Sequence, residues 1–180
     1  VTCYWGHLDV VRLLHANGAD VNQGDTSGRS PLWLASELGN VAIVRLLLNN
    51  YGADINVNQT DVCGVSPLLM ACQMGNSEVA WLLVEGGADV NLQTDEGLGP
   101  LNVSYGLGHF EIAQCLRDNG ADIDYAANEG RTLLFVACQR GQAITARRLL
   151  EHDADVDRSD DNGATPLHAA CENGKIDVVE

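Results

Sequence analysis

Residues 165–170 read Thr-Pro-Leu-His-Ala-Ala, and looser copies of this stretch recur along the chain. The copies are SPLWLA at 30–35, SPLLMA at 66–71, GPLNVS at 99–104 and TLLFVA at 132–137. A hydroxyl residue followed by proline is typical of a helix start, because the hydroxyl caps the helix and proline suits its first position. The recurring stretch therefore predicts a short helix at each of these places.

Glycines give the length of the repeating unit. A glycine follows each predicted helix at 39, 75, 108, 141 and 174, with an earlier one at 6, and the steps are 33 residues except for one of 36. A second series, at 28, 64, 97, 130 and 163, keeps the same register. A third motif closes the units, as Gly-Ala-Asp at 18–20, 52–54, 87–89 and 120–122 and as Asp-Ala-Asp at 153–155. Such a fixed period is the signature of a solenoid array.

Each unit contains a second helical pattern after the first. Val79, Ala80, Leu82 and Leu83 form an apolar stripe suited to burying one helix face, and the pattern ends at Gly87. The following Ala-Asp-Val-Asn segment leads into the next glycine turn as an extended finger. Because helices this short are unstable alone in water, stacking of units must supply the stability.

These residues resemble the ankyrin repeat, whose signature is Thr-Pro-Leu-His-x-Ala at a period of 33 residues. The resemblance covers the whole chain and implies an all-α fold, an ankyrin-repeat solenoid of helix-turn-helix units with extended finger loops. We expect one array, with partial unit 1–24, full units at about 25–57, 58–91, 92–124 and 125–157, and partial unit 158–180. The chain has no initiator Met and ends within a predicted second helix, so we expect a fragment of a longer protein.

One full unit is longer than the others. Aligning the motifs places one extra residue in Asn49-Asn50-Tyr51 and about two in the finger from Val57 to Cys63. Insertions in a solenoid often lie on its binding side. Tolerated drift in loop length is the other interpretation.

Composition and charge narrow the class of partner. The chain is 46% apolar with 19 glycines and 4 prolines, which is typical of a folded protein rather than a disordered one. Its 25 acidic and 10 basic residues give a net charge of −15, which disfavours nucleic acid and anionic membranes. No stretch approaches the ~20 apolar residues of a membrane helix. We expect a protein partner with a basic or apolar segment, and no nucleic acid, membrane or small-molecule substrate.

The cysteines follow the repeat rather than a metal or disulfide pattern. Cys3, Cys72, Cys138 and Cys171 fall five places after the proline position, so we expect small buried side chains there. Units that repeat at roughly 8–10 Å are too far apart for a disulfide. No Cys-x-x-Cys motif is present, which argues against a metal site or cofactor. Free thiols predict an intracellular, cytoplasmic location.

No motif indicates catalysis, so we predict that this stretch is not an enzyme. The acidic run from Glu151 to Asp161 fails as a calcium loop, because Arg158 and Ala164 stand where the loop glycine and the bidentate acid belong. Repeat spacing explains these acids as solvated finger residues. The family resemblance assigns His168 a hydrogen-bonding role at the start of its helix.

The remaining candidates lie on the surface. In ankyrin-like arrays, variable positions on the finger tips and first helices line a concave groove, and here one half of that groove is apolar and the other charged. A cluster of exposed apolar side chains suggests a binding patch. The predicted partner-binding residues are Tyr4, Trp5, Leu38, Cys63, Val65, Met74, Leu98, Leu107, Arg131 and Arg140. Trp5 and Met74 are the predicted anchors, whereas Val65 and Leu98 have the alternative of packing against neighbouring fingers.

Trp81 breaks the pattern of the second helices. Its equivalents are polar, namely Arg12, Arg45, Gln114, Arg147 and Glu180. Two interpretations stay open: Trp81 is a second contact site, or it covers a gap between units.

The predicted function is a protein-protein interaction module, a scaffold or adaptor that binds its partner in the concave groove. The alternative is a regulatory or targeting segment of a larger enzyme, channel or ubiquitin-ligase adaptor whose active domain lies outside this chain. A third possibility concerns Asn22, Asn56 and Asn91, which resemble asparagines that are hydroxylated in some ankyrin proteins.

Overall fold

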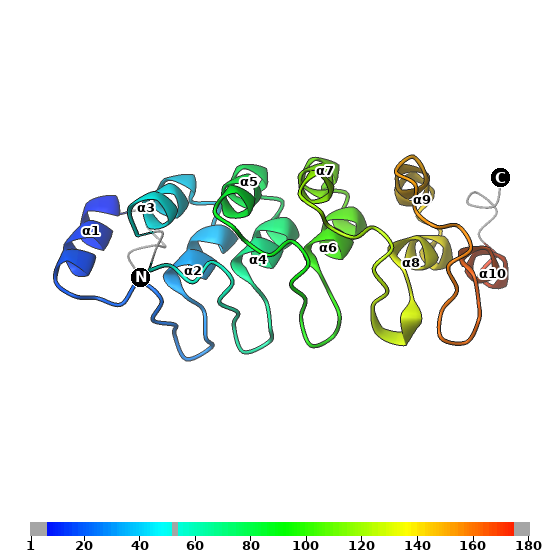
Figure 1. The fold of residues 1–180 in the computed structure, drawn as a ribbon, viewed down its shortest axis with the longest axis horizontal. Coiled ribbons are helices and arrows are strands. Elements are labelled where there is room, and N and C mark those ends of the chain that lie inside the picture. The colour runs from blue at the N-terminus through cyan, green and yellow to red at the C-terminus, as the bar shows by residue number, and fades with distance from the viewer. Residues whose placement is uncertain (1–6, 52–53, 175–180) are drawn as a thin grey trace.

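The structure is a computed structural model that describes residues 7–51 and 54–174, and within them it is an elongated stack of paired helices (Figure 1). The first helices of the units are α2 (Pro31–Glu37), α4 (Pro67–Met74), α6 (Pro100–Leu107), α8 (Leu133–Arg140) and α10 (Pro166–Glu172). The second helices are α1 (Leu8–Ala16), α3 (Val41–Tyr51), α5 (Ser77–Glu85), α7 (Phe110–Asp118) and α9 (Ala143–Leu150). One finger contains a 3₁₀ turn, η1 (Asn128–Gly130), and the described part of the chain has no β-strand. The all-helical prediction is confirmed.

The predicted helix starts are confirmed by their caps. The side chain of Ser30 accepts a hydrogen bond from the Trp33 N–H at 3.1 Å, and Ser66 accepts one from Leu69 at 3.1 Å. These bonds satisfy N–H groups that have no partner inside the helix. At the other end of α4, Gly75 has φ 72°, a left-handed conformation that glycine adopts without steric cost.

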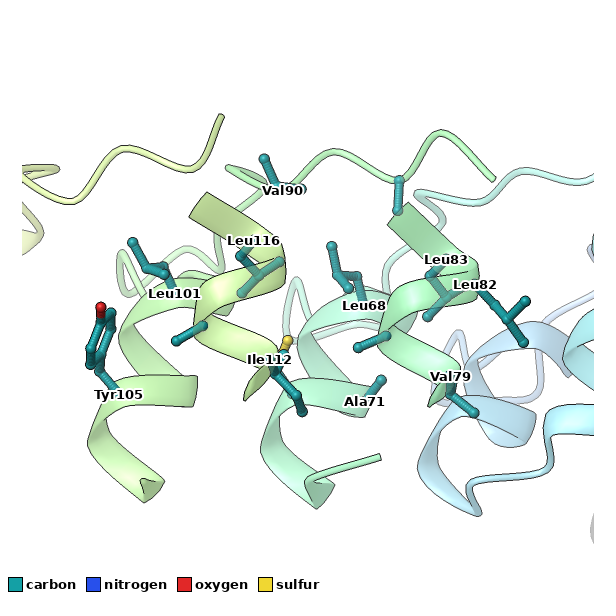
Figure 2. Packing of buried hydrophobic residues seen from close by; sticks show 14 of the residues in the cluster. Leu68, Ala71, Val79, Leu82, Leu83, Val90, Leu101, Tyr105, Ile112 and Leu116 are labelled. Carbon is teal, nitrogen blue, oxygen red and sulfur yellow. The ribbon is translucent and has the colours of Figure 1, made fainter. Parts of the chain in front are cut away.

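The core is one continuous layer of apolar side chains between the two rows of helices. It runs from Val11 in α1 to Ala170 in α10. Figure 2 shows its central part, where Leu68 of α4 lies between Leu83 of α5 and Leu116 of the next unit. Each unit thus buries its apolar faces against its neighbours, because a helix pair alone has no second layer to cover them.

The slot five places after the proline position faces the following unit. The Cys72 thiol is fully buried against Ser104, and burial raises its pKa to about 12. Cys138 is buried in the same way. Cys171 is exposed, so the prediction of a buried side chain is wrong there, since no described unit follows α10 to cover it. The five cysteines in the described ranges are free thiols, as predicted, and Cys3 lies outside those ranges.

Tyr105 occupies this slot in unit 92–124 and changes the packing. Its ring is 2% exposed and meets Phe110 edge to face, with the ring centroids 6.1 Å apart. Helices α4 and α6 pack closely, as do α8 and α10, but α6 and α8 are in much looser contact. A cleft of about 440 Å³ lined by Tyr105, Phe110 and Arg148 opens at this junction. The large ring thus lies at a junction where two units are in looser contact than their neighbours.

The extra residues of the long unit do not lie in its finger. In regular units an aspartate carboxylate accepts the N–H of the residue two places on, as Asp89 does for Asn91 at 2.9 Å. In the long unit Asn56 does this for Asn58 at 3.3 Å. The predicted lengthening of the finger from Val57 to Cys63 is therefore wrong. The insertion precedes Asn56, where α3 continues to Tyr51 and is 11 residues long against 9 for α5.

Candidate interaction surface

The finger tips are folded by buried or half-buried carboxylates. Asp61 Oδ1 accepts the N–H groups of Cys63 and Val65, both at 2.9 Å. Asp160 Oδ1 accepts those of Asn162 at 2.9 Å and Ala164 at 2.8 Å, and these backbone bonds, Ala164 first, lower its pKa. The prediction that the acids of this run are all solvated is wrong for Asp160, which is buried. These bonds give each finger a defined tip.

Neighbouring fingers are also bonded to each other. The Val62 N–H donates to the Ser27 carbonyl, and the Asp161 N–H donates to that of Glu129, both at 3.0 Å. At the finger bases, Asn58 Oδ1 accepts the Asp89 N–H at 2.9 Å. The fingers therefore form a connected surface, which we call the finger surface: the finger tips together with the exposed ends of the first helices.

An arginine lies over an aromatic ring near the start of the finger surface. Arg29 Cζ is 5.6 Å from the centroid of the Trp33 ring, and its guanidinium bonds to Asp25 Oδ2 at 2.7 Å. This bond lowers the pKa of Asp25 and raises that of Arg29. The charge of Arg29 is thus already paired within its own finger.

The same arrangement recurs at the far side. Arg131 Cζ is 5.4 Å from the centroid of the Phe135 ring, and its guanidinium bonds to Glu129 at 2.8 Å. Arg131 is half-buried in this stacked and paired position, and its predicted role in binding a partner stays a prediction. The signal for both stacks, an arginine four residues before an aromatic residue, is present in the sequence and was missed.

Exposed apolar side chains gather on the part of the finger surface between these two stacks. Leu98 is 46% exposed, Cys63 is exposed and Val65 is half-buried. The ends of the consecutive first helices α2, α4 and α6 add three more exposed side chains, namely Leu38, Met74 (53% exposed) and Leu107 (55% exposed). Arg140 lies at the equivalent end of α8 and is also exposed. We call Leu38, Val65, Met74, Leu98 and Leu107 the apolar row.

Of the two anchors predicted from the sequence, Trp5 and Met74, only Met74 lies among the described residues. Met74 lies in the apolar row, whereas Tyr4 and Trp5 lie outside the described residues. Val62 is more exposed than any residue of the row and stands at the tip of its finger. Its exposure follows from the turn at Asp61, which points the neighbouring side chain outward.

The asparagines singled out as hydroxylation candidates have structural roles. Asn22 Oδ1 accepts the Asn56 N–H at 2.8 Å, and Asn91 Oδ1 accepts the Asp122 N–H at 3.2 Å. In the long unit the equivalent of Asn91 is Asn58, not Asn56, because Asn58 bonds to the next unit's Asp89. Modification of Asn22 and Asn91 stays a prediction.

The described residues show few signs of metal binding or membrane insertion. Residues 7–51 and 54–174 contain no group of three or more His, Cys, Asp or Glu side chains able to hold a metal ion. Within the same ranges, no helix combines the length and the apolar character needed to span a bilayer. What these residues present is a surface of finger tips and helix ends.

Comparison with known proteins agrees with this architecture. The family described as "Ankyrin repeats (3 copies)" matches residues 1–59, 55–127 and 101–180, which together span the whole chain. A photoreceptor ankyrin repeat protein of Homo sapiens is 49% identical over 57 residues. That match covers 31% of this chain and 13% of the human protein, so it spans a small part of the relative's length. The chain belongs to the ankyrin repeat family.

Proposed function

We propose that this chain is a protein-protein interaction module that holds a partner on its finger surface. Ankyrin repeats are generally modules of this kind, and the finer assignment rests on the distribution of exposed side chains. The single observation that carries it is the apolar row, five apolar residues at exposed or half-exposed places on consecutive units. Such clusters on an otherwise polar surface mark binding sites.

The charges around the apolar row specify the chemistry of the partner. Asp95, Glu96 and Asp161 are exposed at the finger tips, while Arg29 and Arg131 are each neutralised by a carboxylate. A segment with apolar side chains flanked by lysine or arginine fits this arrangement, since its apolar groups cover the row and its cations meet the acidic tips. An intracellular location stays a prediction from the free thiols.

The experiment compares variants in affinity capture and then with purified partner. The double variant Met74→Asp, Leu98→Asp places two charges in the apolar row, and the control Ile144→Asp places one such charge on α9, where Ile144 is 71% exposed. We expect a protein that is captured by the wild type and by Ile144→Asp and lost with the double variant. Equal capture by all three folded proteins would refute the proposal.

A further inference from the structure

Trp81 lies on the outer row of helices, away from the finger surface. It belongs to α5, in the upper row of Figure 1, while the fingers project below the first helices. Its side chain is 55% exposed. It therefore does not close a gap between units, which was one of its two interpretations, and a large aromatic ring is left in contact with solvent.

The preceding unit shows what this position does when it holds arginine. Arg45, the equivalent of Trp81, bonds to Glu78 of the next second helix at 2.9 Å. The equivalent of Glu78 one unit on is Glu111, and Trp81 cannot pair with it. In residues 7–51 and 54–174, Glu111 forms no ion pair. Tryptophan at this position therefore takes the place of an arginine that would form an ion pair between units, and its ring lies beside the Glu111 carboxylate in the same groove.

Trp81 and Glu111 line the same groove between α5 and α7, which has a volume of about 430 Å³. Glu78 and Asp118 also line it, and no lysine or arginine does. The Asp118 carboxylate is held by the Gln114 amide at 2.7 Å. Burial raises the pKa of Cys115 in the groove wall, and the charges of Asp118 and Glu85 add to that effect. The groove is therefore negative as well as partly apolar.

The chain itself shows which group fits such a site. Arg29 lies over Trp33 and bonds to Asp25, and Arg131 lies over Phe135 and bonds to Glu129. Each combination joins a guanidinium to an aromatic face and to a carboxylate, which is favourable because the planar cation stacks and hydrogen-bonds at once. The groove at Trp81 provides an aromatic ring and carboxylates, but no guanidinium group is among its lining residues.

We propose that the groove between α5 and α7 binds an arginine side chain of a basic segment in a partner protein. The guanidinium stacks on Trp81 and pairs with Glu111 and Asp118. This site is separate from the finger surface and does not depend on the function proposed for it. Arginine is favoured over lysine, because an ammonium group is a compact hydrated charge that stacks poorly.

The test uses a fluorescein-labelled peptide with three repeats of Gly-Ser-Arg, and versions with lysine or neutral citrulline in place of arginine. Binding to the whole chain is measured by fluorescence anisotropy at physiological salt. Trp81→Arg removes the ring and restores the residue type of Arg45, and Glu111→Gln removes one groove charge. Glu151→Gln is the matched control, because it removes the same charge from an exposed side chain at the end of α9, outside both the groove and the finger surface. Trp81→Gln, with the residue type of Gln114, replaces Trp81→Arg if that variant does not fold.

We expect Trp81→Arg to weaken binding of the arginine peptide at least tenfold, Glu111→Gln to weaken it severalfold and Glu151→Gln to leave it unchanged. The lysine peptide should bind severalfold more weakly and the citrulline peptide should not bind. Equal losses in Glu111→Gln and Glu151→Gln would overturn the proposal, because they would indicate general attraction to a chain of charge −15. Wild-type affinity in Trp81→Arg would overturn it too. A dimer that is detected by sedimentation velocity and depends on Trp81 would also overturn the proposal, since the groove would then hold a second copy of this chain.

Discussion

The indole N–H of Trp33 donates a hydrogen bond to the backbone carbonyl of Val65 at 3.0 Å. This bond joins the first helix of one unit to the finger of the next. The ring is buried and supports Arg29 on its face. Trp33 occupies the place that His168 holds in the TPLH stretch, where the histidine ring bonds to Thr165 of its own unit. One residue thus links the finger surface to the stack.

Removing that bond should weaken the stack. We expect Trp33→Phe to lower the free energy of unfolding by about 1–2 kcal/mol, because the half-buried Val65 carbonyl loses one of its two donors, keeping the Asp61 N–H, and the smaller ring leaves a gap. Urea denaturation followed by far-UV circular dichroism measures it. Trp81→Phe is the control at an exposed tryptophan and should change stability by less than about 0.5 kcal/mol. Equal effects of the two substitutions would contradict this role of Trp33.

The register of the long unit can be tested at Asn58. Asn58→Ala should cost about 1 kcal/mol, since the Asp89 N–H loses its acceptor. Asn58→Asp should cost less than half as much, because Asp124 accepts the equivalent Asp155 N–H with a carboxylate at 2.9 Å. The measurement is again urea denaturation. If the aspartate variant were as unstable as the alanine variant, the assignment of Asn58 would be wrong.

The buried Cys72 thiol predicts a loss of stability in base. An unfolded thiol deprotonates near pH 9.0, whereas burial raises the pKa of Cys72 to about 12. The stabilisation is therefore complete below pH 9 and is lost as the pH rises toward 12. The stability difference between wild type and Cys72→Ala should shift against the wild type by about 1.4 kcal/mol per pH unit above 9. A difference that stays constant from pH 7 to pH 10.5 would show that the thiol ionises freely in the fold.

The junction at Tyr105 should not tolerate the smaller residue found at Cys72. We expect Tyr105→Cys to cost about 2–4 kcal/mol, because the ring fills the space between units that are already loosely packed. Tyr125→Cys, at a tyrosine that is 40% exposed, should cost less than about 0.5 kcal/mol. Thermal unfolding of both variants gives the comparison. If Tyr105→Cys were as stable as the wild type, units 92–124 and 125–157 would have closed the gap.

The sequence predicted the repeated features of this fold because each has a local cause. Ser66 and Pro67 start a helix wherever they occur, and Gly75 ends it, so spacing alone locates the elements. The exposed position of Met74 follows from its place at the end of α4. These features depend on the chain within one unit.

Features that depend on two units were harder to predict. The motif at 52–54 suggested that Asn56 matches Asn91, but α3 continues to Tyr51, whose ring packs on His15 with centroids 3.9 Å apart. The hydrogen bonds of the finger are therefore shifted by two residues relative to that motif. The stacking of Arg131 on Phe135 and its pairing with Glu129 were not predicted, because both require the folded finger. The exposure of Cys171 could not be predicted from its own unit, because burial at this position depends on the unit that packs next to it.

Hydrogen–deuterium exchange of the chain, alone and saturated with a purified partner, tests the central claim most directly. The account predicts slower exchange in the finger tips at 61–65 and 94–98 and at the ends of α4 and α6, where the apolar row lies. Unchanged exchange in these four segments, with protection elsewhere in the chain, would contradict the assignment of the finger surface as the partner-binding site.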